Sequence, residues 1–164
     1  MKKLILVLAF PLIFACENDK DSAINPNSEM IQGEDSGEFP CVNAQADTLP
    51  TLDSAKALIV GKWQLKGMIA RMANPEIPNY QIEFLADGGV TVTLAGKKVF
   101  SDAYSVIEET SNGYRSLKLI TDSLMDLENQ HNIVKGNIRI CEKELMLDQG
   151  IAFDAPGYLF RKVK

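Results

Sequence analysis

Alternation of apolar and polar residues is the feature that most constrains how this chain can fold. Residues 80–84 read YQIEF and residues 90–94 read VTVTL, so every second side chain is apolar in both segments. Such a period of two is typical of β-strands with one buried face. The sequence between them contains Asp87, Gly88 and Gly89, which predict a tight hairpin turn. The pattern therefore predicts antiparallel strands joined by short turns.

The same pattern continues to the end of the chain, with further turn sequences at 95–97 and 111–113. A polar, helical segment is predicted at 122–130. A closed barrel buries one face of every strand and leaves no free edge, so we predict an all-β fold, a small eight-stranded antiparallel up-and-down barrel. A sandwich of two sheets is the alternative. The predicted strands cover residues 61–72, 80–84, 90–94, 98–108, 114–121, 133–141, 144–148 and 157–163.

A short helix is predicted immediately before the first strand. Residues 53–63 read DSAKALIVGKW, in which Asp53 or Ser54 is a suitable N-cap and Gly61 marks the end of the helical turn. A helix in this position would plug one end of the barrel.

The start and the end of the predicted barrel resemble those of the lipocalins. Gly61 and Trp63 form a Gly-x-Trp motif after the short helix, and Arg161 in the last strand matches the arginine that packs on that tryptophan. The resemblance implies a lipocalin-like barrel domain over residues 51–164, similar to small bacterial lipocalin-like lipoproteins. It also implies that Trp63 closes the narrow end under a cation–π contact from Arg161.

The lipocalin resemblance further implies a small apolar or amphipathic ligand in the barrel, bound without chemical change. The candidate ligand-binding residues are aromatic and lie on strands whose aromatic side chains face inward, although each is equally explained as core. A barrel filled by its own side chains would instead favour a surface module that binds a protein or glycan partner. The four candidates are Tyr80, Phe84, Phe100 and Tyr104.

The N-terminus has the pattern of a bacterial lipoprotein signal. Lys2 and Lys3 precede an apolar run of about 12 residues, which suits a signal peptide and is too short to cross a bilayer. The sequence IFAC at 13–16 resembles the lipobox, in which the chain is cut before a cysteine that carries a lipid. We predict that residues 1–15 are removed after Sec export and that acyl chains such as palmitate are attached at Cys16. An ordinary secretory signal is the alternative.

Residues 16–50 are predicted to form a flexible acidic tether between the lipid and the barrel, because they are polar and lack periodicity. Their acidic start resembles that of surface-exported lipoproteins of bacteroidetes type. The predicted location is therefore the outer membrane of the cell envelope, in either leaflet. The membrane is the partner predicted from these residues, and they do not identify a particular protein partner.

The chain contains three cysteines, and lipidation of Cys16 leaves Cys41 and Cys141. In an oxidising compartment these two are predicted to form a disulfide. Two free thiols are the alternative.

Composition and motifs exclude several functions. The net charge is −5, or −7 once Lys2 and Lys3 are removed, whereas nucleic-acid binding requires a basic face. The single histidine, His131, lies in a polar segment, and no nucleophile, P-loop, Rossmann or metal-ligand motif is present in the sequence. We therefore predict no enzymatic activity, no cofactor and no bound metal.

Overall fold

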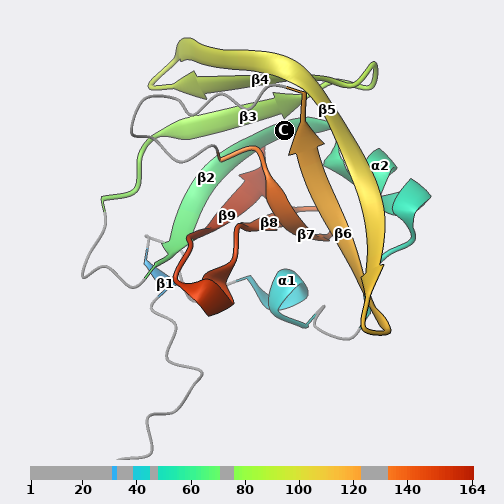
Figure 1. Ribbon diagram of the computed structural model, residues 1–164. Helices are drawn as coiled ribbons and strands as arrows, with labels where there is room; N and C mark the ends of the chain where they lie inside the picture. Colours follow the sequence, from blue (N-terminus) through green and yellow to red (C-terminus); the bar gives the residue numbers. More distant parts are fainter. Residues whose placement is uncertain (1–30, 33–38, 45–47, 71–75, 123–132) are drawn as a thin grey trace, which may run out of the picture.

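The computed structural model describes residues 31–32, 39–44, 48–70, 76–122 and 133–164 of the 164-residue chain (Figure 1). The predicted signal peptide, Cys16, His131 and nearly all of the predicted helical segment at 122–130 lie outside these residues. The elements are β1 Ile31–Gln32, α1 Pro40–Ala44, α2 Leu52–Ile59, β2 Gly61–Ile69, β3 Tyr80–Phe84, β4 Gly89–Leu94, β5 Lys97–Ser111, β6 Tyr114–Thr121, β7 Gly136–Ile140, β8 Glu144–Asp148, the 3₁₀ helix η1 Ile151–Phe153 and β9 Gly157–Lys162.

Strands β2 to β9 form a closed eight-stranded antiparallel barrel. Each strand pairs with the next along the chain, and β9 pairs with β2 to close the ring. The predicted barrel is thus confirmed, and the alternative of two separate sheets is wrong. Figure 1 shows the ring with α2 on one side and η1 on the other.

Two hairpins owe their tightness to residues with positive φ. Asn112 and Gly113 have φ of 52° and 81°, and the flanking Ser111 and Tyr114 pair directly. Because the ladder continues up to this two-residue turn, β5 extends to Ser111, beyond the predicted end at residue 108. The turn at 95–96 has the same pattern of positive φ.

The up-and-down order gives the barrel two distinct ends. The helix end carries α2 and the turns at 85–88, 112–113 and 141–143. The loop end carries the turn at 95–96 and the loop at 149–156, and β3 and β7 begin there.

The N-cap of α2 lies two or three residues earlier than the sequence indicated. Its N-cap is Thr51, whose hydroxyl accepts a hydrogen bond from the Ser54 amide at 3.2 Å, so the prediction of Asp53 or Ser54 was wrong. A threonine oxygen in this position satisfies an amide that has no partner within the helix. Ala55 and Ile59 are buried against the barrel interior, so the helix closes this end as predicted.

Part of the predicted tether is folded against the outside of the barrel. Strand β1 pairs with the last residues of β2, Met68 and Ile69. Phe39 and Val42 of the next segment are fully buried. They belong to a second apolar cluster, separate from the core, whose other members are Ile69, Met146 and Leu159, with Ile151 packed against it. The folded body therefore includes residues before 51.

Candidate functional site

Trp63 closes the helix end of the barrel, as predicted. Its side chain is fully buried, and its indole nitrogen donates a hydrogen bond of 2.7 Å to the carbonyl of Ile59, at the end of α2. The amine of Lys162 lies 5.0 Å from the centre of the indole ring and donates to the carbonyl of Leu58. One cation therefore contacts both the tryptophan and the C-terminal end of the helix, where positive charge is favourable.

The glycine of the Gly-x-Trp motif is required by its surroundings. Gly61 has φ of 126°, which side chains of L-residues rarely adopt, and a Cβ atom there would lie 3.0 Å from the Lys162 side chain. The glycine of the motif thus leaves room for the side chain of Lys162 beside Trp63.

The prediction that Arg161 packs on Trp63 is wrong. Trp63 lies opposite Lys162 in the β2–β9 ladder, and both face the interior. Because side chains alternate along a strand, Arg161 faces outward. Its guanidinium lies over the ring of Phe39, 4.4 Å from the centre, in the segment that covers the outer face of the barrel.

A buried carboxylate connects Arg161 to this outer segment. Glu144 is 5% exposed, and its two oxygens have different partners. One forms an ion pair of 2.8 Å with Arg161, and the other accepts hydrogen bonds from the amides of Cys41 and Val42. A buried carboxylate is costly unless it is paired in this way. Glu144 was not among the site residues predicted from the sequence, although its position at the start of the apolar run ELML was an available signal.

The predicted cysteine pair is brought together beside this carboxylate. Cys41 and Cys141 lie within disulfide-bonding distance, and their Cα atoms are 6.4 Å apart. Cys41 is the second residue of α1 and Cys141 follows β7, so the pair fixes the outer segment to the barrel wall. This cluster holds the fold together, and its polar groups satisfy one another.

The four predicted ligand-binding residues all face inward, but they are packed in the core. Tyr80, Phe84 and Phe100 are at most 6% exposed. The ring of Tyr104 packs edge-on against Phe84 at 4.9 Å, and its hydroxyl donates to the carbonyl of Leu85. Three of the four therefore have almost no surface left for a ligand.

Inward-facing side chains of every barrel strand except β5 include some that have no exposed surface. A side chain with 0% exposure borders no space large enough for a water molecule, so its surroundings are packed. Residues of this kind are contributed by β2, β3, β4, β6, β7, β8 and β9. They are Trp63, Ile82, Phe84, Val92, Leu119, Ile140, Leu145, Leu147 and Phe160.

Two tyrosines, Tyr80 and Tyr158, are buried in the half of the core nearest the loop end. Burial raises the pKa of Tyr80 and raises the pKa of Tyr158 to about 12, with the charge of the ionised Tyr80 contributing to the shift of Tyr158. Tyr158 is 3% exposed. Its phenol is held in its neutral form because ionisation would place a charge among apolar side chains.

Tyr158 provides a pH test of whether this half of the barrel is packed. The folded protein holds the phenol proton more tightly than the unfolded chain. The contribution of Tyr158 to the free energy of unfolding is therefore fully present below the unfolded pKa of about 10, and it is lost as the pH rises towards about 12. Absorbance titration of phenolate ionisation is expected to show one late transition that disappears in Tyr158→Phe. A titration in which all the tyrosines ionise together near pH 10 would instead indicate a hydrated interior.

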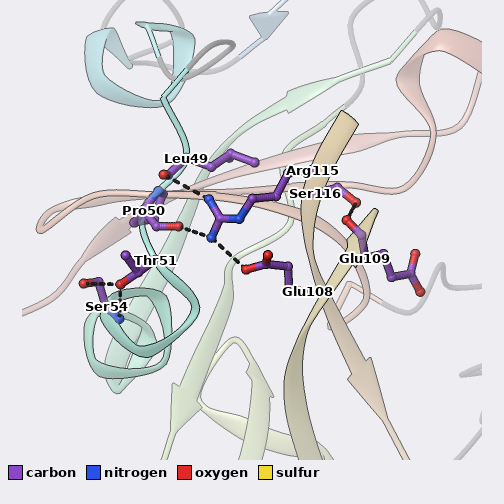
Figure 2. A network of polar contacts seen from close by, with 8 residues as sticks. All are labelled: Leu49, Pro50, Thr51, Ser54, Glu108, Glu109, Arg115 and Ser116. Carbon is purple, nitrogen blue, oxygen red and sulfur yellow. Dashed lines mark hydrogen bonds and ion pairs between the residues drawn. The ribbon is translucent and has the colours of Figure 1, made fainter. Parts of the chain in front are cut away.

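The hairpin between β5 and β6 is fixed to the helix end by one arginine. The guanidinium of Arg115 donates to the carbonyls of Leu49 and Pro50, at 3.3 and 2.7 Å, and pairs with Glu108 at 2.8 Å (Figure 2). The hydrogen bond from Arg115 lowers the pKa of Glu108. These contacts join β5, β6 and the segment that leads into α2.

The same hairpin presents an aromatic side chain to solvent. Tyr114 is 81% exposed and directly precedes the anchored Arg115. Rigid, exposed aromatic residues are favoured at the centres of protein interfaces because little conformational entropy is lost on binding. The hairpin therefore has the properties of a recognition element.

Within the described part of the chain, no group of three or more histidine, cysteine, aspartate or glutamate residues is arranged to hold a metal ion. No helix among these residues has the length and apolar character needed to cross a membrane. A scan against protein-family models finds no match, and searches of curated proteins and of solved structures find no significant match.

Proposed function

We propose that this chain is a bacterial envelope lipoprotein, anchored through an acylated Cys16, whose lipocalin-like barrel is a rigid, non-catalytic module that binds a protein or glycan partner. The observation that carries the proposal is the packing of the barrel interior. Tyr80, Phe84 and Phe100, the residues expected to line a ligand pocket, are at most 6% exposed. Such a barrel would therefore bind a partner through its outer surface and its turns.

The β5–β6 hairpin is the best supported binding element. Its tip carries the exposed Tyr114, and the neighbouring Arg115 ties this tip to the carbonyls of Leu49 and Pro50. A partner that contacts this hairpin meets a preorganised surface, which reduces the entropy lost on association.

A second candidate is a small apolar ligand at the loop end. It is supported by the partly buried Met68 and Leu94, which pack against the core and lie opposite Tyr158 and Tyr80 in their strand ladders. Apolar walls with a few convergent polar groups are characteristic of small-molecule sites.

Mass spectrometry of the full protein, extracted from its own membranes, tests these alternatives. We expect the same mass before and after denaturation, because a packed interior leaves no room for a bound small molecule. A difference of several hundred daltons that disappears on denaturation, in the range of the ligands that protein pockets bury, would support the second candidate.

The surface part of the proposal is tested by crosslinking in intact cells before extraction. We expect a crosslinked macromolecular partner that is lost in Tyr114→Ser. Val99→Ser is the matched control, since Val99 is also exposed but lies on the wall of the barrel near the loop end. Equal crosslinking in both variants would exclude the hairpin as the binding element.

A further inference from the structure

We propose that the loop end of the barrel rests on the membrane that holds the lipid anchor, with Phe153 inserted among the lipid headgroups. This inference rests on the proposed acylation of Cys16 and adds an orientation to it. Phe153 is 89% exposed, although it belongs to the short helix η1 in a tightly bonded loop. An aromatic side chain held in water by a rigid loop suggests a partner that covers it.

The loop is built to present this side chain. The carboxylate of Asp148 accepts hydrogen bonds from the amides of Gly150 and Ile151, at 2.7 and 2.8 Å. Further backbone bonds run from Phe153 and Ala155 to the carbonyl of Gly150. Ile151 packs into the apolar cluster on the outer face of the barrel and fixes the loop there. Phe153, two residues further on, points away from this cluster into solvent.

The direction of the chain identifies the membrane as the occupant. Ile31 pairs with Ile69 of β2, and Ile69 pairs with Gly157 at the start of β9, so these three residues form one row across the sheet. The N-terminal segment therefore meets the barrel beside the loop that carries Phe153, and Figure 1 shows β1 close to η1. Ile31, from which the chain leads back towards Cys16, therefore lies at the same end of the barrel as the exposed phenylalanine.

The tether length makes a weak contact sufficient. Only 14 residues, 17–30, separate Cys16 from Ile31. At roughly 3.3–3.6 Å per residue they span at most about 50 Å, so the anchor keeps the loop end at a high local concentration near the lipid surface. The acyl chains hold the protein on the membrane, so the aromatic side chain only has to favour one orientation of a barrel that is already at the surface.

The surrounding charges oppose this contact only weakly. The described part of the loop end carries three lysines, Lys97, Lys98 and Lys135, and four carboxylates, so its formal charge is only −1; the carboxylates are those of Glu76, Asp122, Asp148 and Asp154. The chain without its first 15 residues has a charge of −7, so this end is less repelled by anionic lipid than an average face of the protein. Tyr114, on the opposite end, is then directed away from the membrane.

Tryptophan substitution measures the depth of each end. The full-length acylated protein is reconstituted in vesicles of phosphatidylethanolamine and phosphatidylglycerol, with and without bromine on the acyl chains. Phe153→Trp is expected to lose most of its added fluorescence in the brominated vesicles. Tyr114→Trp is the matched control, because it replaces another highly exposed aromatic residue at the opposite end, and it is expected to lose none. The fluorescence of the buried Trp63 in the wild-type protein is subtracted from both.

The outcomes separate this inference from the anchor on which it rests. Before reconstitution, the mass of the protein shows whether Cys16 is acylated; an unmodified chain would overturn the anchor and the orientation together. If the acylated Phe153→Trp variant is quenched by aqueous iodide and not by brominated lipid, only the orientation is overturned. Equal lipid quenching of both variants would also overturn it, because neither end would then be preferred.

Discussion

Replacing Cys41 and Cys141 together with alanine is expected to lower the free energy of unfolding by about 4–5 kcal/mol. The bond would link residues 100 positions apart, and in the chain-entropy model a loop of that length strongly restricts the unfolded chain. The loss also frees α1, whose Val42 is buried and whose first amides bind Glu144.

Denaturant unfolding followed by the fluorescence of Trp63 measures this change. The wild-type protein under reducing conditions is the control, and it is expected to match the double variant because both lack the crosslink. An unchanged unfolding midpoint in both would contradict a stabilising disulfide.

Trp63→Ala is expected to cost about 3–5 kcal/mol, the usual range for truncating a large buried aromatic side chain. Trp63 is fully buried, fills the space between α2 and the barrel, and supports Lys162 on its ring. Its loss leaves a cavity at the end of the core and removes the bond to Ile59.

A milder variant separates packing from hydrogen bonding at this position. Trp63→Phe retains an aromatic ring but cannot donate to Ile59, so a part of the loss, about 1–3 kcal/mol, is expected from the unpaired carbonyl. Circular dichroism is the suitable measurement because the fluorophore is removed. A cost below about 1 kcal/mol for Trp63→Ala would contradict its role in closing the barrel.

The barrel could be predicted from sequence because its determinants are local. The alternation of Ile82 and Phe84 with polar residues, and turns such as Asn112–Gly113, each depend on a few neighbouring residues. Closure then follows from the need to protect strand edges. The burial of Trp63 was predictable for the same reason, since it follows a helix stop and begins an alternating strand.

The contacts between residues 39–44 and the outer face of the barrel could not be predicted in this way, because they join distant parts of the chain. Glu144 binds the amide of Cys41 from 103 positions away, and Phe39 lies in a segment whose composition indicates a flexible tether. Two signals were nevertheless present. The uninterrupted apolar runs in β8 and β9 indicate strands covered on both faces, and the inward Phe160 requires that Arg161 face outward.

The location of the molecule depends on residue 16, so the denatured mass of protein extracted from the membranes of the producing cell is the most direct test. We expect a chain that begins at Cys16 and carries added acyl mass. A chain that retains residues 1–15, or that begins elsewhere with an unmodified thiol at residue 16, would contradict the proposed lipoprotein.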